Sequence, residues 1–288
     1  MTDQYADPLN RIDCYVNRID CYAVLGNPIA HSKSPLIHEA FAKQTAQNIR
    51  YERILVPLDG FKAAVFQLLK QGYKGVNVTV PFKLEAFELC DALSERAAAA
   101  GAVNTLFFEG EKIRGDNTDG AGLVNDILNN LKSTIANKHV LLLGAGGAAQ
   151  GVLLPILSAQ PANLTIANRT IEKAHFLVQK IAAENNICNI MVSTFENLQS
   201  PFDIIINATS ASLSDSALCL PNKIFAHHCL AYDMMYGRET QFMKQAKENG
   251  AQVADGLGML VEQAAEAFYL WRGVRPQTAP VIAMIRAL

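Results

Sequence analysis

Short apolar runs alternate with amphipathic stretches from Asp20 to about Gly115. The apolar runs have the length of strands, and the amphipathic stretches begin near proline or end at glycine, as helices do. This alternation predicts an α/β sheet that contains parallel pairs of strands. We expect strands at residues 21–25, 50–57, 75–80, 105–109 and 112–114, and helices at residues 34–47, 61–71, 84–93 and 94–100.

A second series of alternating strands and helices follows a predicted connecting helix at residues 123–131. The run at residues 204–207 is continuously apolar, which is typical of a strand that is buried on both faces of a sheet. The last apolar stretches of the chain are helical in pattern. We expect strands at residues 139–143, 163–167, 190–192, 204–207 and 230–233, and helices at residues 148–157, 171–184, 259–271 and 280–287.

The two series predict two α/β domains, which a chain of 288 residues also favours because a single core seldom grows so large. We place the first domain at residues 20–121 and the second at 122–256, with a cleft between them. The helices within residues 257–288 are expected to pack back on the first domain. Residues 1–19 hold the first copy of a repeated hexapeptide, Asn-Arg-Ile-Asp-Cys-Tyr, and are interpreted as an appended arm.

Composition narrows the range of partners. Hydrophobic residues make up 50% of the chain, charged residues 18%, and the formal net charge is -2 without blocks of like charge, so neither nucleic acid nor a membrane is an expected partner. No apolar run reaches the roughly 20 residues that span a bilayer, and the polar N-terminal segment has no export signal. The six cysteines lack CxxC spacing and the six histidines form no ligand pattern. We therefore expect reduced thiols, no metal site and a cytoplasmic location.

A glycine-rich turn stands between the strand at residues 139–143 and the helix that follows it. Its G-x-G-x-x-A pattern uses Gly144 for the tight turn, Gly146 for a close approach of the backbone to a pyrophosphate, and Ala149 for close packing of the helix. The positive end of the helix dipole also favours a phosphate there. The turn predicts that the second domain is a Rossmann domain that binds a dinucleotide.

The end of the next strand discriminates between NAD and NADP. An NAD-binding domain usually has an acidic residue there to bind the ribose 2′-hydroxyl. This chain has Asn168, Arg169 and Thr170, followed by Lys173. Arg169 can bind a 2′-phosphate through a forked, charge-assisted contact, and Thr170 can cap the next helix and donate to the same phosphate. The sequence therefore favours NADP.

Polar side chains also gather in loops of the first domain. Ser32 and Ser34 lead into a helix, where hydroxyls and the helix dipole could hold a carboxylate, although Ser34 could equally be an N-cap. Lys83 follows the strand at residues 75–80, and amides and carboxylates occupy residues 101–105 and 115–120. Loops at the ends of strands in such sheets line the ligand crevice. Together these groups predict a polar pocket of polyol size that faces a nicotinamide.

Seven motifs in this order resemble those of the shikimate dehydrogenase family across almost the whole chain. They are G-N-P-I-x-H-S-x-S-P-x-I-H, N-V-T-V-P-F-K, G-A-V-N-T, G-D-N-T-D-G, G-A-G-G-A, N-R-T and D-G-x-G-M-L-V-x-Q. The resemblance implies a substrate-binding α/β domain, a Rossmann NADP-binding domain, and an active site in the cleft between them. It also implies the reversible NADPH-dependent reduction of 3-dehydroshikimate to shikimate, a step of aromatic amino-acid biosynthesis, by a monomer or homodimer.

The family pattern assigns roles to the positions that match its motifs. Lys83 and Asp119 match the catalytic pair. The positions that match substrate contacts are Ser32, Ser34, Thr79, Lys83, Asn104, Asp119, Tyr236 and Gln263. The positions that match cofactor contacts are Gly144, Ala145, Gly146, Gly147, Ala148, Asn168, Arg169, Thr170, Ile171, Glu172, Lys173, Met234 and Gly256, with Glu95 as a further candidate.

Reduction of a ketone places negative charge on its oxygen, so a cation beside that oxygen is the strongest single aid. We expect Lys83 to act as general acid in reduction and as base in oxidation, with Asp119 orienting it. An ordinary lysine is a poor base at neutral pH, so the proton transfer must be concerted with hydride transfer or relayed to water.

The chain departs from the family pattern at two cofactor positions, and two alternative functions stay open. Gln150 stands where Arg or Lys is frequent, and Lys173 where Arg is common, which could weaken NADP binding. A quinate/shikimate dehydrogenase with broader substrate and cofactor use is one alternative, and Arg169 argues against its use of NAD. A non-catalytic NADP sensor is the other, and the presence of both Lys83 and Asp119 argues against it.

Overall fold

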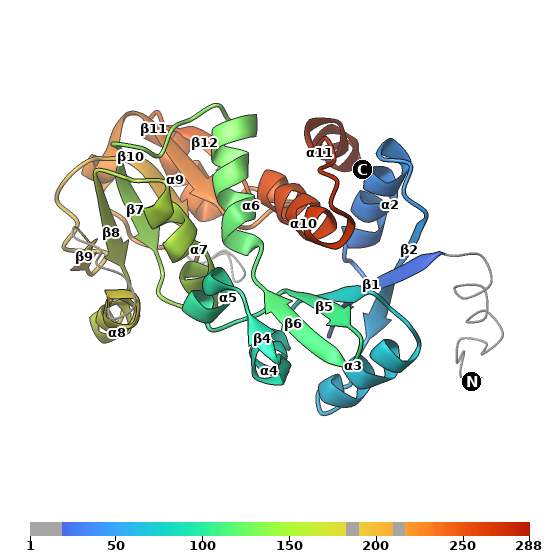
Figure 1. Ribbon diagram of the computed structural model, residues 1–288. Helices are drawn as coiled ribbons and strands as arrows, with labels where there is room; N and C mark the ends of the chain where they lie inside the picture. Colours follow the sequence, from blue (N-terminus) through green and yellow to red (C-terminus); the bar gives the residue numbers. More distant parts are fainter. Residues whose placement is uncertain (1–18, 183–189, 210–216) are drawn as a thin grey trace, which may run out of the picture.

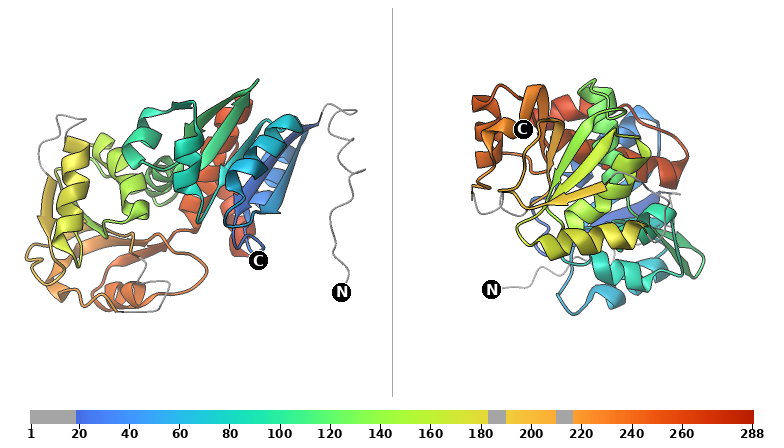
Figure 2. Two further views of the ribbon diagram at one scale, coloured as in Figure 1. Left: turned by 90° about the horizontal axis from the view of Figure 1, so that it is seen from below. Right: turned by 90° about the vertical axis from the view of Figure 1, so that its left-hand side faces the viewer.

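The computed structural model describes residues 19–182, 190–209 and 217–288. In this part of the chain there are two six-stranded sheets, which occupy separate halves of the molecule (Figures 1 and 2). The expected α/β class is therefore confirmed. The proposed arm at residues 1–19 and the end of the helix expected at 171–184 lie largely outside the described residues.

The first sheet is mixed, with the strand order β2-β1-β3-β5-β6-β4. Strands β1, β2 and β3 are parallel, whereas β5 pairs antiparallel with both β3 and β6. The strands are β1 (Asp20–Gly26), β2 (Ile49–Leu55), β3 (Gly75–Val78), β4 (Ala92–Leu93), β5 (Thr105–Glu109) and β6 (Lys112–Asp116). The helices of this half are α2 (Ser34–Gln44), α3 (Phe61–Lys70), α4 (Lys83–Leu89) and α5 (Glu95–Ala100).

The second sheet is entirely parallel, with the order β12-β11-β10-β7-β8-β9. The chain begins at β7, proceeds outward to β9, and returns to add β10 on the other side of β7, which is the doubly wound order of a Rossmann domain. The strands are β7 (His139–Leu143), β8 (Asn163–Ala167), β9 (Ile190–Ser193), β10 (Phe202–Asn207), β11 (Phe225–Asp233) and β12 (Gln252–Asp255). The helices are α7 (Gly147–Ser158), α8 (Ile171–Ala182) and α9 (Gln241–Glu248).

Helices cover both faces of the second sheet, which explains its continuous apolar strands. On one face Leu142 packs in a cluster with Ile156 of α7 and Leu177 of α8. On the other face Ile205 packs in a cluster with Phe242 of α9. Because successive side chains of a strand point to opposite faces, a strand between two helical layers must be apolar at every position.

Helices α6 (Asp119–Asn125) and α10 (Leu257–Arg272) lie between the two sheets and pack on each other (Figure 1). The α6 helix continues as a π-helical turn, η2 (Asp126–Asn130). The end of α10 returns to the first sheet, where Trp271 donates to the Leu106 carbonyl at 3.1 Å and stacks on Tyr22. Helix α11 (Ala279–Arg286) joins α10 and α2 in one apolar cluster.

Several predicted elements differ from the structure. The helix expected at residues 84–93 ends at Leu89, because Cys90 turns to an extended conformation and residues 92–93 pair with β6 as β4. The helix expected at 123–131 begins earlier, at Asp119. Helix α9 and strand β12 were not predicted.

Cys21 is disulfide-bonded, so the expectation of reduced thiols is wrong for this residue, whereas Cys90, Cys219 and Cys229 are free. Within the described part of the chain, no helix is both long and apolar enough to cross a membrane.

Candidate active site

Lys83 and Asp119 form an ion pair at the junction of the two halves. Lys83 is the first residue of α4 and follows β3, and Asp119 is the first residue of α6. Lys83 Nζ lies 2.6 Å from Asp119 Oδ2, and the two side chains are 31% and 20% exposed. A lysine at the positive end of a helix dipole is electrostatically unfavourable, so the Asp119 carboxylate offsets a local cost. The pair is thus accessible to a ligand while it is held in one geometry.

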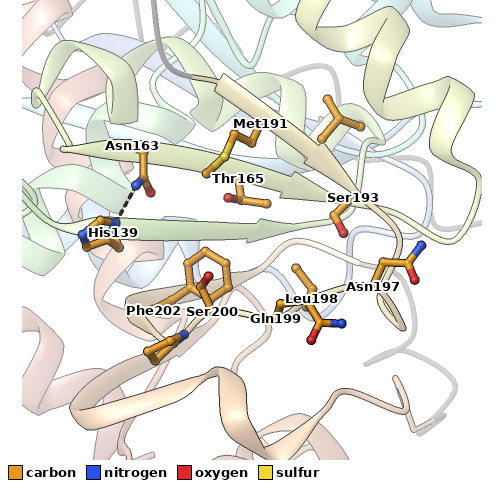
Figure 3. Close-up of a pocket in the computed structure, with 12 residues that line it drawn as sticks. His139, Asn163, Thr165, Met191, Ser193, Asn197, Leu198, Gln199, Ser200 and Phe202 are labelled. Carbon is orange, nitrogen blue, oxygen red and sulfur yellow. Dashed lines mark hydrogen bonds between the residues drawn. The ribbon is translucent and has the colours of Figure 1, made fainter.

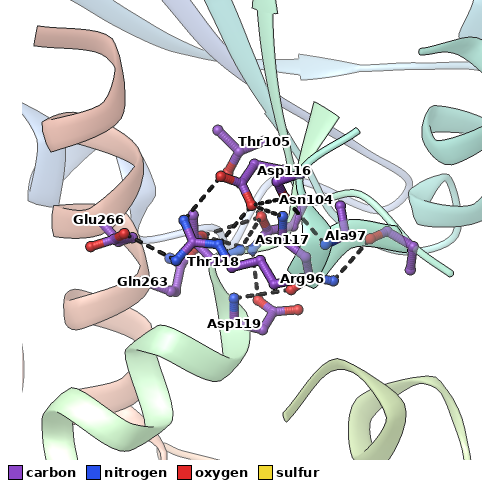
Figure 4. A network of polar contacts seen from close by, with 12 residues as sticks. Arg96, Ala97, Asn104, Thr105, Asp116, Asn117, Thr118, Asp119, Gln263 and Glu266 are labelled. Atoms are coloured by element: carbon purple, nitrogen blue, oxygen red, sulfur yellow. Dashed lines mark hydrogen bonds and ion pairs between the residues drawn. The ribbon is translucent and has the colours of Figure 1, made fainter. Parts of the chain in front are cut away.

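Asn104 holds the carboxylate of this pair (Figure 4). Its side-chain amide donates to Asp119 Oδ1 at 2.8 Å, and its Oδ1 accepts from the Thr118 backbone N–H at 2.9 Å. The residue is 3% exposed. Because both amide ends are used, neither Asn104 nor Asp119 can rotate without breaking a buried hydrogen bond.

A second polar cluster lies beside the pair and links the first sheet to α10 (Figure 4). Arg96 donates from Nε and Nη2 to the two carboxylate oxygens of Asp116 at 2.7 and 3.0 Å, and from Nη1 to Glu266 at 3.1 Å. Although burial opposes ionisation, the carboxylates of Asp116 and Glu266 raise the pKa of Arg96. Sequence reasoning missed Arg96, because 170 residues separate it from Glu266 and no local pattern relates them.

The serine loop of residues 30–34 lies at the carboxyl end of β1. Ser32 Oγ lies 3.2 Å from Ser34 Oγ, and the Ser34 backbone N–H donates to Ser32 Oγ at 3.3 Å. Arg53 of β2 donates from Nε to the Ser32 carbonyl at 2.8 Å. Ser34 is the first residue of α2, and Lys33 occupies the N-cap without a side-chain cap bond. The alternative that Ser34 caps the helix is therefore wrong, and its hydroxyl is available for other contacts.

Three further predicted substrate residues lie after β3, on α10 and after β11. Thr79 follows β3, and its Cγ2 stands 2.5 Å from the point where a Cβ on Gly26 would be, so only glycine allows this approach. Gln263 of α10 faces Thr118, whose hydroxyl lies 3.5 Å from Gln263 Oε1. Tyr236 is half-buried after β11 and packs against the cluster of α2 and α10, and burial raises the pKa of its phenol.

The glycine turn has the form that a dinucleotide requires. Gly144 has a φ of +105°, which L side chains rarely adopt, and a Cβ there would lie 3.2 Å from the Ala208 carbonyl. A Cβ on Gly146 or Gly147 would meet nothing within 4 Å, so the N-terminus of α7 opens onto free space. Ala149 is fully buried against the sheet. These features fit a pyrophosphate at the helix N-terminus.

The segment at residues 168–173 lies at the same edge of the second sheet. Strands β7 and β8 are parallel neighbours that end in register, Leu143 beside Ala167. Asn168 donates from its side chain to the Thr170 carbonyl at 2.7 Å, which shapes the turn, and Arg169 is exposed. The exposed guanidinium is available to a 2′-phosphate because its turn is fixed by neighbouring groups.

The other predicted cofactor residues are Met234, Gly256 and Glu95, and only the first two lie together at this edge of the sheet. Met234 follows β11, and its backbone N–H donates to the Asn207 carbonyl at 3.1 Å, which places it at the same edge of the sheet. Gly256 lies directly against the Met234 backbone, where a Cβ would collide. Glu95 is exposed on α5, a helix that packs on α7, and no contact links its side chain to the glycine turn.

A separate hollow of about 490 Å³ lies at the second sheet (Figure 3). His139, Asn163 and Phe202 on its wall are first residues of β7, β8 and β10, so it lies toward the amino ends of these strands. Ligands of doubly wound sheets bind at the carboxyl ends, and the hollow is therefore distinct from the candidate active site. Among the described residues, no group of three or more His, Cys, Asp or Glu side chains could hold a metal ion.

A Rossmann domain with a nucleotide turn, joined to a second domain that presents a lysine–carboxylate pair, defines a nicotinamide-dependent oxidoreductase. Comparison with family models makes the assignment specific. Residues 24–106 match the shikimate dehydrogenase substrate binding domain, residues 125–214 match shikimate / quinate 5-dehydrogenase, and residues 256–286 match the shikimate 5′-dehydrogenase C-terminal domain. The chain belongs to the shikimate dehydrogenase family.

Individual relatives agree with this assignment. The chain is 62% identical over 266 residues to shikimate dehydrogenase (NADP(+)) of Herminiimonas arsenicoxydans, covering 92% of this chain and 96% of that one. It is similar to a crystal structure of an Ael1 enzyme from Pseudomonas putida, with a TM-score of 0.87, 49% identity, and coverage of 92% and 97%. It is also similar to the shikimate 5-dehydrogenase of Thermus thermophilus in complex with NADP(H) and shikimate, with a TM-score of 0.83, 31% identity, and coverage of 94% and 100%.

Proposed function

We propose that Lys83 and Asp119 are the catalytic pair of this protein. The protein is an NADP-dependent oxidoreductase that acts on a CH–OH group, a shikimate dehydrogenase that reversibly reduces 3-dehydroshikimate to shikimate. The observation that carries the catalytic assignment is the 2.6 Å ion pair, which remains accessible between the two halves. The broader quinate/shikimate alternative is not favoured by relatives such as that from Herminiimonas arsenicoxydans.

The residues present fit NADP at the carboxyl edge of the second sheet. When bound there, NADPH supplies the hydride. The N-terminus of α7 and its open glycines would hold the pyrophosphate, and Arg169 would hold the 2′-phosphate. The full set proposed for the cofactor is Gly144, Ala145, Gly146, Gly147, Ala148, Asn168, Arg169, Thr170, Ile171, Glu172, Lys173, Met234, Gly256 and Glu95.

The substrate would lie over the Lys83–Asp119 pair, with its carboxylate at the serine loop. Ser32 and Ser34 would donate to the carboxylate, and Asn104, Thr79 and Gln263 would contact the ring hydroxyls. Tyr236 would complete the site from the side of the second domain. This placement is supported by the closeness of Asn104, Thr118 and Gln263 to Asp119.

Lys83 would hold a proton beside the carbonyl oxygen of the substrate during reduction. Charge that develops on this oxygen is stabilised by the lysine ammonium, and the proton then moves from Nζ to oxygen. Asp119 would keep Nζ in place and accept from the neighbouring hydroxyl. In oxidation the same groups would act in reverse, with Lys83 receiving the hydroxyl proton.

We also propose the domain division at residues 20–121, 122–256 and 257–288, with residues 1–19 as an arm. A monomer or homodimer in the cytoplasm is the proposed state. Light scattering coupled to size-exclusion chromatography tests the assembly, since a larger mass than that of a dimer would contradict it.

The first experiment is an assay of the purified protein at the NADPH absorbance band. Shikimate and quinate are each combined with NADP⁺ and with NAD⁺. We expect rapid turnover with shikimate and NADP⁺ alone. Comparable rates with quinate or NAD⁺ would favour the broader enzyme, and no turnover in any of the four combinations would favour the sensor.

A further inference from the structure

A chain of buried hydrogen bonds runs through the first domain to the catalytic pair. Tyr51 of β2 donates from its hydroxyl to Asn77 Oδ1 at 2.7 Å, and the Asn77 amide donates to Thr105 Oγ1 at 3.0 Å. The Thr105 hydroxyl donates to Asn104 Oδ1 at 2.8 Å. The Asn104 amide then donates to Asp119 Oδ1 at 2.8 Å (Figure 4).

The hydrogen bonds of this chain all run in one donor-to-acceptor direction. Each member accepts from the member before it and donates to the next, until the Asp119 carboxylate, which accepts from Asn104 on one oxygen and from Lys83 on the other. Such ordered chains polarise each bond in the same sense and strengthen one another. The Asn77 amide also donates to the Asn104 backbone carbonyl at 3.2 Å, which can only accept, so Asn77 Oδ1 is left to accept from Tyr51.

The start of the hydrogen-bond chain is packed against α2. Tyr51 stacks on the ring of His38 in α2, with centroids 4.1 Å apart and planes 7° apart. Burial raises the pKa of Tyr51 well above its usual range, so its hydroxyl keeps the proton that it donates to Asn77.

Burial makes the chain costly to break. Thr105 is fully buried, Asn104 is 3% exposed and Asn77 is 7% exposed. Removing one donor leaves a buried acceptor without water to replace the lost partner, at a cost of about 1–3 kcal/mol. The amide that follows in the chain then loses one of the contacts that hold its orientation.

We propose that Tyr51 and Asn77 are positioning residues that maintain the orientation of Asp119 and Lys83 through Thr105 and Asn104. The inference rests on the proposed function of Lys83 and Asp119. In this role Tyr51 and Asn77 act by supporting the Thr105 hydroxyl and the Asn104 amide, and through them the carboxylate that holds the Lys83 ammonium.

The test is the Tyr51→Phe variant, which removes one hydroxyl and keeps the ring that stacks on His38. We expect kcat for shikimate oxidation to fall about tenfold, the equivalent of 1.36 kcal/mol within the range for an unpaired buried group, with the KM for NADP⁺ unchanged. The matched control is Tyr73→Phe, because the Tyr73 hydroxyl bonds Glu52 outside the chain. A normal kcat in Tyr51→Phe would overturn the proposal.

A second pair of variants tests the hydrogen-bond chain at Thr105. Thr105→Val removes the hydroxyl at nearly constant volume, and Thr105→Ser retains it. We expect the valine variant to lose kcat and the serine variant to recover it. Combined with Tyr51→Phe, Thr105→Val should add little further loss, since groups in one network are not additive. Losses that multiply in the double variant would show independent damage and overturn the proposal.

The two levels of inference fail differently. If the unaltered protein does not oxidise shikimate, the proposed function falls, and this inference falls with it. If the unaltered protein is active and the hydroxyl variants match their controls, only the positioning role is wrong. Thermal unfolding shows whether each variant is folded at the assay temperature. A loss of kcat can then be distinguished from a loss of folded protein.

Discussion

Single residues carry the proposed chemistry through their immediate partners. Lys83 occupies the first turn of a helix, where the dipole disfavours a cation, and it is retained there by a carboxylate 2.6 Å away. That carboxylate is in turn held by Asn104 at 2.8 Å. A developing alkoxide is stabilised by a cation that is held in place and is still accessible to a ligand. Lys83 meets both conditions.

Replacing the lysine tests its role directly. We expect Lys83→Ala to lower kcat by about a hundredfold or more, within the range for loss of a general acid–base. Binding of NADPH, measured by fluorescence titration, should be unchanged. The control is Lys62→Ala, since Lys62 is an exposed lysine on α3. Near-normal turnover in Lys83→Ala would remove this residue from the mechanism.

Replacing the exposed arginine tests the choice of cofactor. We expect Arg169→Ala to raise the KM for NADP⁺ about tenfold to a hundredfold, because a charge-assisted contact contributes roughly 1.5–3 kcal/mol. The KM for NAD⁺, which has no 2′-phosphate, should hardly change. Arg114→Ala serves as the control, because Arg114 pairs with Glu109 on an exposed hairpin. An equal rise in KM for NADP⁺ and NAD⁺ would show that Arg169 does not bind the 2′-phosphate.

Close packing of α6 between α7 and α10 joins the two halves at the scale of elements. A Cβ on Gly120 would collide with Pro155 of α7, and a Cβ on Gly122 would lie 2.7 Å from Gln263 Cβ and 2.8 Å from the Met259 carbonyl. The helices therefore approach backbone to backbone on both sides of α6. Because Asp119 begins this helix and Gln263 lies on α10, the same packing positions both site residues.

A methyl group at this crossing should be poorly tolerated. We expect Gly122→Ala to lower the free energy of unfolding by about 1–3 kcal/mol, the usual cost of overpacking. Gly151→Ala on α7 is the matched control, because the nearest atom to its Cβ would be 3.7 Å away. Urea unfolding measures both. Equal stability of the two variants would mean that α6 can shift without cost.

The buried ring of His38 makes the free energy of unfolding of the whole molecule sensitive to acid. His38 is fully buried among the rings of Tyr51, Phe41, Phe268 and Trp271. Burial lowers its pKa from 6.5 to about 3. Between these two pH values the unfolded chain binds a proton at His38, whereas the folded chain does not. The contribution of the neutral ring to the free energy of unfolding is therefore fully present above about pH 6.5 and is lost as the pH falls toward 3.

Removing the ionisable ring should flatten this dependence. Between pH 7 and pH 5 the unaltered protein should lose about 2 kcal/mol more free energy of unfolding than His38→Phe, at 1.36 kcal/mol per pH unit. Urea unfolding at both values measures the difference. The control, His175→Gln, replaces an exposed histidine of α8. The same slope in His38→Phe and the unaltered protein would place the acid sensitivity elsewhere.

Much of this molecule follows from local order along the chain. Strands β7 to β11, the nucleotide turn at Gly144 and the Arg169 segment were predictable, because strand periodicity, tight turns and charge are properties of neighbouring residues. The catalytic pair was suggested by motif resemblance rather than by spacing. The end of α4 at Leu89 was not predicted, since it depends on the pairing of residues 92–93 with β6.

Tertiary structure alone decided which distant groups meet. The pairing of Arg96 with Glu266 spans 170 residues, and the contact of Tyr51 with Asn77 spans 26 residues and joins β2 to β3, between which β1 lies in the sheet. No periodicity relates such residues, because their closeness results from sheet order and from the return of α10 to the first domain. Local patterns in the sequence therefore predicted most of the helices and strands and the cofactor class, and the motif resemblance supplied the candidate residues. The fold determined the direction of the hydrogen-bond chain and the burial of His38, since both require surroundings that only packing creates.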